Sequence, residues 1–306
     1  MTSVERDIRS TPAILQQTLA RLDRDGGVIV RQLHGPVVFL GCGSSYCLAA
    51  SATALYEESH GEPARAIVAS DYRPWRDWTH VAISRSGTTT EVVEAMRQAR
   101  RSGARVLLIS GDVDTPAETE ADAVLRLEFA AERGVIQTRF ITATLLALRV
   151  LIGGDRARAA LQDVAERLDD ALAAFDPTPN GAHDHVVYLG RGWRHGLALA
   201  GALNVQETAL LVAEGHQTLD YRHGPIACAS EESLVWCLDP RDDAPSSAVL
   251  DDVRRTGATV WQTDDDPIVT LSQAQLLAVR MAERRGLNPD APRHLARSVV
   301  LPVLRA

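Results

Sequence analysis

The sequence has 306 residues and a mass of 33.1 kDa, more than a single hydrophobic core usually organises, so we expect two domains of about 150 residues. Hydrophobic residues make up 45% of the chain and charged residues 24%, which is the balance of an ordinary globular protein and not of a disordered one. With 40 acidic and 32 basic residues the net charge is -8, which argues against nucleic acid and anionic membranes as partners.

Two further features are absent from the sequence. One bears on where the protein is located and the other on which reactions it can catalyse. No stretch approaches the roughly 20 uninterrupted apolar residues that span a bilayer, and the first residues are charged where a secretion signal is apolar, so we expect a cytoplasmic protein. There is no lysine, so all 32 basic residues are arginine. A lysine Schiff base to a substrate or to pyridoxal phosphate is therefore excluded, as is the phosphate-loop lysine of P-loop ATPases.

The cysteines are spaced neither for a zinc site nor for a disulfide framework. Cys42, Cys47, Cys228 and Cys237 stand singly, without close CxxC pairs or histidine companions. We expect reduced, mostly buried thiols, no metal and no cofactor.

The first half of the chain alternates predicted strands with predicted helices. Residues 4–24 have apolar positions at helical spacing, and Pro12 is placed to begin a second helix, so residues 1–34 are predicted to form a helical arm. VVFLG then predicts a buried strand, GCGSS a turn of small residues, and the Ala-rich segment after it a helix. The order recurs with the strand THVAIS, the loop SRSGTTT, a helix from near Glu91 and the strand RVLLIS. This alternation predicts parallel strands with crossover helices, hence an α/β sandwich.

The second half repeats this order. Residues 175–184 contain the Pro, Gly and Asn of a linker. Beyond them HVVYLGRGWRHGLALAGALN again gives strand, Gly loop and helix, roughly 150 residues after the first copy, and SLVWCLDP and ATVWQTD are later strands. A last helix stops near Gly286 and continues as a Pro-rich tail that we expect to pack over a neighbouring surface. The predicted domains are 35–174 and 185–306, the second including the tail.

The loop at residues 84–90 is a candidate phosphate site. It lies between a strand and a helix, where unpaired backbone N–H groups and the helix dipole favour an anion. Ser84, Ser86 and Thr89 add hydroxyl donors, so that no lysine is needed. Helix capping alone uses one such residue, whereas this loop has five hydroxyls in seven positions. The GCGSS turn, with Ser44 and Ser45, could approach the same ligand, although such a turn is weak evidence by itself.

Two residues of the second half are candidates for acid–base chemistry. Asn204 and Glu207 are three apart and project from one face of a predicted helix. His223 is fixed in a turn just before Pro225. From the residues alone, a surface glutamate and a structural histidine remain equally good interpretations.

Six segments distributed over both halves resemble a known family. GCGSSY, SRSGTTTE, ERGVIQTR, GLALAGALNVQE, YRHGP and LNPDAPRHLARS occur in the order and spacing of the sugar isomerase (SIS) family. The resemblance runs from about residue 8 and is greatest to the isomerase half of glucosamine-6-phosphate synthase and to stand-alone phosphosugar isomerases, deaminases and deglycases. It implies two tandem SIS domains, each a three-layer αβα sandwich, and a homodimer with shared active sites. The sugar-phosphate contacts that it implies are Ser44, Ser45, Ser84, Arg85, Ser86, Thr89, Val135, Gln137 and Asn204.

The resemblance also implies catalytic roles. In the family, the glutamate of the GALxxxE helix moves a proton between C1 and C2 of the open-chain sugar, and the HGP histidine assists ring opening. Glu207 and His223 occupy these positions. The chain departs from the synthase in having Arg297 where an imine-forming lysine stands, and Asn204 for the helix lysine; the glutaminase half is also absent.

Taken together, these residues predict a phosphosugar isomerase acting on a hexose or amino-hexose 6-phosphate through an enediol, without a Schiff base. Glu207 and His223 would be catalytic, and Arg297 would serve as an electrophilic or phosphate-side cation. Amino-sugar-phosphate deamination or fructosamine-6-phosphate deglycation is the alternative reaction, and non-catalytic sugar-phosphate sensing is the alternative of another class.

Overall fold

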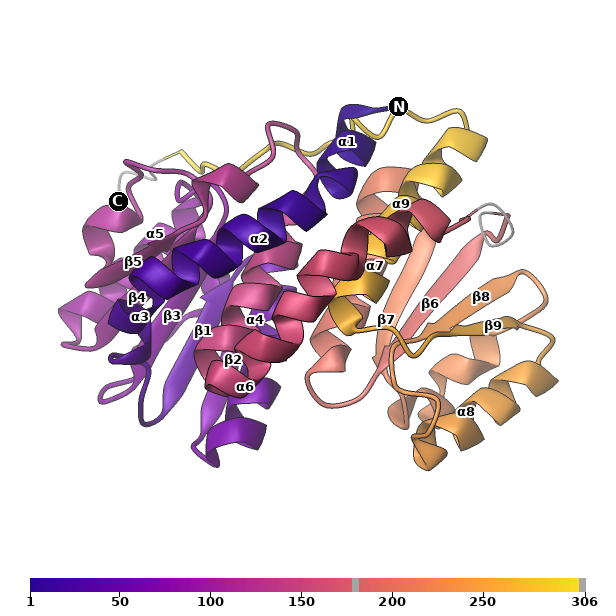
Figure 1. Ribbon diagram of the computed structural model, residues 1–306, viewed down its shortest axis with the longest axis horizontal. Coiled ribbons are helices and arrows are strands. Elements are labelled where there is room, and N and C mark those ends of the chain that lie inside the picture. Colours follow the sequence, from indigo (N-terminus) through magenta and orange to yellow (C-terminus); the bar gives the residue numbers. More distant parts are fainter. Residues whose placement is uncertain (178–181, 303–306) are drawn as a thin grey trace.

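The computed structural model describes residues 1–177 and 182–302, which form two lobes, each built on a parallel sheet (Figure 1). The first sheet has the strand order β2-β1-β3-β4-β5 and the second β7-β6-β8-β9. The strands are β1 (Val37–Gly41), β2 (Ala64–Val68), β3 (Thr79–Ser84), β4 (Arg105–Ser110), β5 (Ala123–Arg126), β6 (His185–Gly190), β7 (Val212–Gln217), β8 (Ser233–Cys237) and β9 (Thr259–Gln262). Every pairing is parallel, which confirms the predicted α/β class.

Helices form the central and outer layers and the N-terminal arm. The arm consists of α1 (Ser3–Arg9), α2 (Thr11–Arg21), the π-helical turn η1 (Leu22–Gly26) and α3 (Gly27–Val30), with Pro12 in the first turn of α2 as predicted. The remaining helices are α4 (Ser44–His60), α5 (Thr90–Arg101), α6 (Arg139–Ala174), α7 (Arg194–Ala209), α8 (Ala244–Arg255) and α9 (Pro267–Arg284). Short 3-10 turns are η2 (Ala69–Asp71), η3 (Glu118–Glu120), η4 (Glu128–Ala130), η5 (Asp220–His223) and η6 (Pro225–Cys228).

The alternation of side chains along the strands divides the core into three parts. On β1, Phe39 faces the helices between the two sheets, whereas Leu40 faces α5 on the outer side. The inner side of the second sheet, with Tyr188 and Trp236, joins the same central cluster, while its outer side packs on α8. One hydrophobic core therefore runs between the sheets through α2, α4, α6, α7 and α9, and it holds the lobes together.

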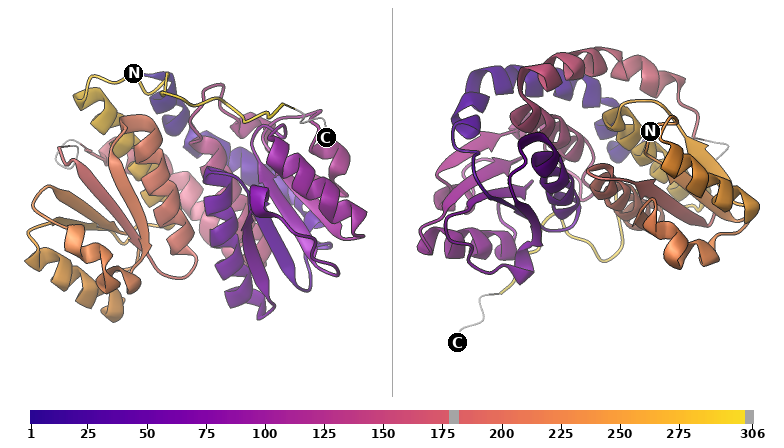
Figure 2. Two further views of the ribbon diagram at one scale, coloured as in Figure 1. Left: turned by 180° about the vertical axis from the view of Figure 1, so that it is seen from behind. Right: turned by 90° about the horizontal axis from the view of Figure 1, so that it is seen from below.

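The structure contains several strands and one long helix that were not predicted, and they lie mainly between the sequence motifs. Strands β2, β5 and β7 and the long helix α6, which bends at Gly154 with a φ of 64°, carry no motif and were not predicted. The predicted linker at 175–184 falls partly on residues 178–181, outside the described residues. The tail after α9 returns to the first lobe and crosses it (Figure 2). It is therefore a contact between the lobes, although it follows the second sheet in sequence.

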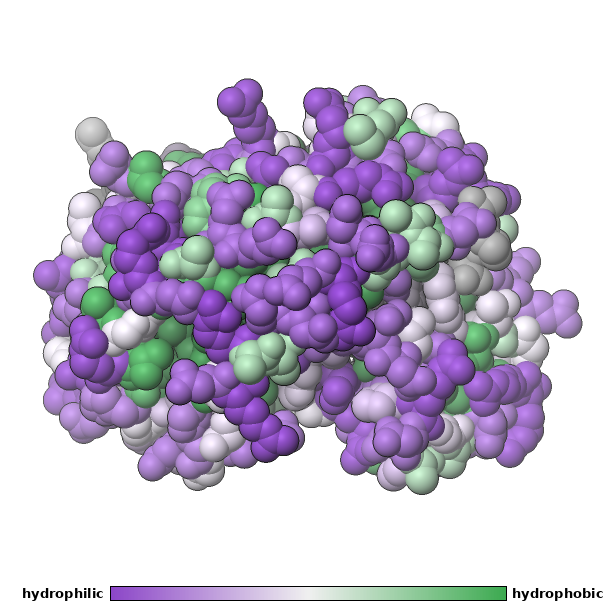
Figure 3. Space-filling model, in the orientation of Figure 1, coloured by the Kyte–Doolittle hydropathy of each residue, from purple (hydrophilic) through white to green (hydrophobic). Residues whose placement is uncertain are grey.

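Within the described residues, no helix has the length and apolar character needed to cross a bilayer. The face seen in Figure 3 is largely hydrophilic, with apolar side chains in small groups among charged ones.

The junction of α4 and α7 depends on a glycine. A Cβ at Gly196 would lie 2.4 Å from the backbone oxygen of Cys47 and 2.3 Å from Ser51 Oγ. Because backbone cannot move aside cheaply, we expect Gly196→Ala to lower the free energy of unfolding by about 1–3 kcal/mol, measured by urea denaturation. Gly27→Ala is the control, since its Cβ would meet only the end of the Arg31 side chain, at 3.3 Å. Equal stability of the two variants would contradict this account of the junction.

Candidate active site

The hydroxyl-rich loop between β3 and α5 is shaped by Gly87. Its φ is +61°, and an added Cβ would lie 2.2 Å from Thr115 Oγ1, so both its conformation and its surroundings require glycine. Ser84 Oγ accepts the N–H of Gly87 at 3.0 Å, and Ser86 Oγ accepts the N–H of Thr88 at 3.2 Å. Each serine hydroxyl is thereby fixed as an acceptor, and its own O–H remains to donate to a ligand.

A cavity of about 30 Å³ lies against this loop. It is lined by Cys42, Ser45, Ile83, Ser84, Arg85, Ser86, Thr89, Val92, Gln137 and Arg297. The structure therefore brings together seven of the residues selected from the sequence, and adds Cys42, Ile83 and Val92. A space of this size admits only a compact polar group. The carbon chain of a sugar has to extend beyond it.

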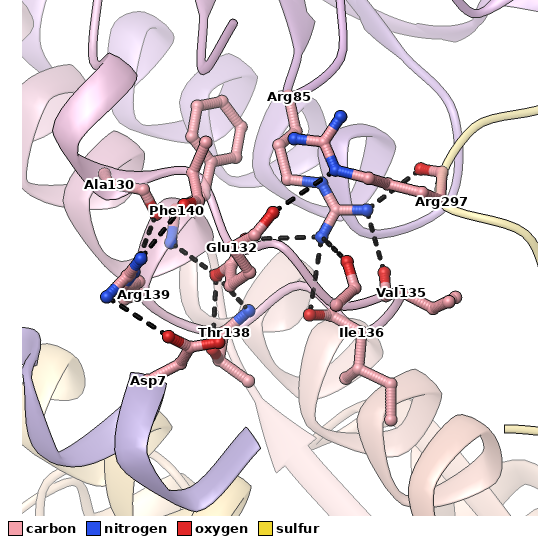
Figure 4. Close-up of polar contacts among 12 residues, drawn as sticks. Asp7, Arg85, Ala130, Glu132, Val135, Ile136, Thr138, Arg139, Phe140 and Arg297 are labelled. Atoms are coloured by element: carbon pink, nitrogen blue, oxygen red, sulfur yellow. Dashed lines mark hydrogen bonds and ion pairs between the residues drawn. The ribbon is translucent and has the colours of Figure 1, made fainter. Parts of the chain in front are cut away.

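Arg85 is an unexpected feature of this cavity, because a cation is buried there. Its side chain is 2% exposed. Nη1 contacts Glu132 Oε2 at 3.3 Å and donates to the carbonyls of Gly134 and Ile136, and Nη2 donates to the carbonyl of Val135 at 2.8 Å (Figure 4). Val135, predicted near the sugar, thus contributes its carbonyl to holding Arg85.

Glu132 supplies the negative charge that offsets the cost of burying the Arg85 guanidinium. It is 1% exposed and accepts the N–H groups of Thr138 and Phe140 at 2.7 and 2.9 Å, at the start of α6. The carboxylate therefore serves both as the partner of Arg85 and as an anionic cap on the positive end of α6. The motif ERGVIQTR contains Glu132, but sequence reasoning assigned it no role. Glu132 is the one acidic residue of a motif whose other charged residues, Arg133 and Arg139, are basic, and this was the available signal.

Arg297 is held at both its side chain and its backbone. Its guanidinium donates to both carboxylate oxygens of Asp112, at 2.6 and 2.9 Å, and to the carbonyl of Glu132 at 3.2 Å. Its own carbonyl accepts from Arg85 Nη2 at 2.9 Å. The hydrogen bonds with Asp112 raise the pKa of Arg297. The positive charge of Arg297 is therefore paired with the carboxylate of Asp112.

The residues that follow Arg297 attach the tail to the start of α5. Thr88 Oγ1 donates to Ser298 Oγ at 3.0 Å, and the N–H of Thr90 donates to the carbonyl of Val299 at 3.1 Å. The tail thereby uses one of the N–H groups that an anion could have taken at this helix. Ser45, Ser84, Ser86 and Thr89 are the hydroxyls that still line the cavity.

The candidates on α7 lie on the second lobe, beside α4. Asn204 is buried, and among the residues that the structure describes its Nδ2 has no hydrogen-bond partner. Glu207 is half-buried, and within the described residues its carboxylate has neither a hydrogen bond nor an ion pair. Burial raises the pKa of Glu207 to about 7, against a smaller lowering by the charge of Arg85. A carboxyl group is therefore poised to exchange a proton near neutral pH, within the field of Arg85.

The remaining predicted residues are not at the cavity. Ser44 is buried in the first turn of α4 and does not line it. His223 lies on η5 and is exposed, so this single chain does not bring it to the hydroxyl loop. Among the described residues, no group of three or more His, Cys, Asp or Glu is placed to hold a metal ion. The four cysteines are free; Cys47 and Cys237 are buried, Cys42 is half-buried and Cys228 is exposed.

Comparison with known proteins identifies a domain in the first part of the chain. Residues 34–153 match the sequence profile of the SIS domain. This part of the chain is a SIS domain. A relative is the glutamine–fructose-6-phosphate aminotransferase (isomerizing) of Brucella abortus, which is 26% identical over an alignment of 355 positions, gaps included. The alignment covers 97% of this chain and 58% of that protein. The chain thus spans little more than half the length of such relatives.

Solved structures resemble both lobes together, beyond the matched SIS domain. A glucosamine-6-phosphate deaminase from Thermotoga maritima superposes with a TM-score of 0.83 at 25% identity, covering 98% of this chain and all of that one. A tagatose-6-phosphate ketose/aldose isomerase from Escherichia coli superposes with a TM-score of 0.84 at 19% identity, covering 99% and 97% of the two chains, which shows a common fold.

Proposed function

We propose that this protein is an isomerase of hexose or amino-hexose 6-phosphates that works through an enediol intermediate without a Schiff base. The observation that carries the proposal is the unpartnered carboxylate of Glu207, whose pKa is raised to about 7, in the field of Arg85. A hydroxyl-lined cavity on the first lobe supplies the matching phosphate subsite.

The proposed reaction is a proton transfer between neighbouring carbons. Glu207 removes the proton from C2 of the open-chain aldose, the C–H electrons form the C1–C2 double bond, and the carbonyl electrons move to O1. Glu207 then returns the proton to C1, and the O2 proton is transferred to O1, so that C2 becomes the carbonyl carbon of the ketose. Each well-positioned acid or base contributes about 10²- to 10⁴-fold to such a step.

The domain organisation is part of the same proposal. The second sheet repeats the order of the first four strands of the first sheet, with a Gly-containing loop and a helix after its first strand, which supports a second SIS domain. We assign 1–34 to the arm, 35–174 to the first domain, 175–184 to the linker and 185–306 to the second domain. His223, exposed on η5, would act in ring opening at the site of a second copy, in a cytoplasmic homodimer.

Deamination is the second candidate reaction. It is favoured by the similarity to the Thermotoga maritima deaminase, which extends over 98% of this chain. The proton transfer would be of the same kind, but an amine at C2 would leave an imine there, and water would hydrolyse it to the ketose and ammonia. In a fructosamine 6-phosphate the amine is on C1, and hydrolysis of the C1 imine would release the amino acid.

Proton exchange tests the proposal whichever product the enediol finally gives. The purified protein is incubated in D₂O with a panel of hexose and amino-hexose 6-phosphates, and proton NMR monitors the C1 and C2 signals. We expect deuterium to replace one of these protons in at least one sugar phosphate. Binding without exchange across the panel would overturn the isomerase and favour a sugar-phosphate sensor.

A further inference from the structure

A larger cavity, of about 470 Å³, lies where the N-terminal arm, the loop before α6 and the tail meet. Its walls are polar side chains and one glycine: Ser3, Arg6, Asp7, Arg133, Gly134, Arg139 and Asp290. None of these residues lines the cavity at the hydroxyl-rich loop. Small-molecule sites usually have volumes of about 300–1,000 Å³, so this arginine-lined cavity has room for a polar organic molecule as well as for a single ion.

Two of its arginines have donors that the protein does not use. The Arg6 side chain donates only to Ser3 Oγ, at 3.2 Å. The Arg133 side chain is exposed, and among the residues that the structure describes it has neither a hydrogen bond nor an ion pair. Each guanidinium has five N–H donors in a fork that matches the oxygens of a phosphate. Two such groups on one cavity, in a protein of net charge -8, therefore form a local site for an anion.

The third arginine is already held by the protein and neutralises the nearest carboxylate. Arg139 donates through Nε and Nη2 to the carbonyls of Ala130 and Ala131, at 3.2 and 3.0 Å. Its Nη1 donates to Ser10 Oγ at 3.0 Å and lies 3.1 Å from Asp7 Oδ1 (Figure 4). Because Asp7 is paired with Arg139, it does not cancel the charges of the two arginines whose donors are unused.

The carboxylates of the cavity can accept hydroxyl groups from a ligand. Asp290 accepts the N–H groups of Ser3 and Val4, at 2.8 and 2.9 Å. A carboxylate can accept about four hydrogen bonds, so Asp290 and Asp7 both retain acceptor capacity. A molecule that offers a phosphate to the two arginines and hydroxyls to the two carboxylates suits this wall. Inorganic phosphate alone would satisfy only the arginines.

This cavity and the candidate active site lie on two sides of the same loop. Gly134 lines the arginine-lined cavity, and its carbonyl accepts from Arg85 Nη1 at 3.3 Å. Figure 4 shows Arg139 and Arg85 on opposite sides of Glu132. The loop at residues 132–136 therefore separates the two cavities, and a ligand at one of them need not occupy the other.

We propose that the arginine-lined cavity is a second binding site of this protein and that it takes a phosphorylated polyol. Arg6 and Arg133 hold the phosphate, and Asp7 and Asp290 accept the hydroxyls. This inference goes beyond the proposed isomerase function and does not depend on it. Because the four residues come from the arm, the loop before α6 and the tail, a bound ligand ties both ends of the chain to the first lobe.

The test is calorimetry with glucitol 6-phosphate, which has no carbonyl group and cannot be isomerised. We expect Arg6→Gln and Arg133→Gln each to weaken binding at this site about tenfold or more, the loss expected for a charge-assisted hydrogen bond. Arg9→Gln is the matched control, since it removes the same charge from the same helix but Arg9 is paired with Glu5. Inorganic phosphate should bind to this site at least tenfold more weakly than glucitol 6-phosphate.

Ser86→Ala separates this site from the candidate active site. It should weaken only binding at the hydroxyl-rich loop, so that the wild type binds two molecules per chain and each type of variant loses one. Binding that is lost in Ser86→Ala but unchanged in Arg133→Gln would overturn the inference and support the proposed function. Binding that is lost only in the arginine variants would support the inference and overturn the phosphate subsite of the proposed function. Absence of binding at millimolar concentrations would overturn both.

Discussion

Replacing Glu207 by Gln is expected to abolish proton exchange while leaving ligand binding intact. The amide keeps the size of the side chain but cannot accept the substrate proton, so the rate should fall by about 10²- to 10⁴-fold. Exchange is measured by proton NMR in D₂O and binding by calorimetry with the same sugar phosphate. Glu58→Gln, on the exposed side of α4, is the matched control. Undiminished exchange in Glu207→Gln would remove Glu207 from the mechanism.

The pH dependence of the wild type follows from the same group. Catalysis requires the carboxylate, and because the pKa of Glu207 is about 7 in the folded protein, activity should fall as the pH is lowered through 7. Stability should change in the opposite direction. An ordinary glutamate has a pKa of 4.5, so between pH 4.5 and 7 the folded state holds a proton that the unfolded state has lost, and stability decreases as the pH rises.

Glu207→Gln should therefore be more stable than the wild type at pH 8, and this gain should vanish as the pH falls toward 4.5. Thermal unfolding at both pH values measures it. This pH dependence of stability also shows whether Glu207→Gln is inactive because it lacks the base or because it is misfolded. A misfolded variant would not be more stable than the wild type at pH 8.

Replacing Glu132 by Ala is expected to cause a large loss of stability. The change leaves Arg85 as an unpaired buried cation and removes the acceptor of the Thr138 and Phe140 N–H groups at the start of α6. Breaking a buried ion pair from one side costs about 3–5 kcal/mol, measured by urea denaturation.

Two variants sharpen this prediction. Glu128→Ala removes a carboxylate that is 42% exposed and pairs with Arg21, and such a surface pair contributes about 1 kcal/mol or less. The double variant Glu132→Leu with Arg85→Met removes both charges, so it should recover part of the loss. If Glu132→Ala and Glu128→Ala lost the same stability, Glu132 would not be the counter-ion that the buried guanidinium needs.

The sequence was sufficient to predict the elements that carry motifs. Apolar runs and glycine-rich turns predicted the strands β1, β3, β4, β6, β8 and β9, because parallel strands buried on both faces are nearly continuous apolar segments. The helices α4, α5, α7 and α9 were predicted with them. The hydroxyl-rich segment at residues 84–90 was likewise predicted to join a strand to a helix, and it lies between β3 and α5 with a cavity against it.

Contacts between residues that are far apart in the sequence could not be predicted from the sequence. Arg297 and Asp112 are 185 positions apart, and neither has a local pattern that indicates the other. The motif SRSGTTT contains Arg85, but only the fold shows that its terminal nitrogens point to residues 132–136 and not to a ligand. Strand β7 was missed because VAEGHQ has charged and glycine residues where a buried strand would be apolar.

The position of Arg297 in the cavity wall has a consequence for biosynthesis. All five strands of the first sheet are present once residue 126 has been made, so this lobe can begin to fold while the ribosome is still translating the second. Its cavity, however, lacks a wall until residues 297–301 have been made and have crossed to α5. A nascent chain halted between these points would have a folded first sheet but no finished ligand site.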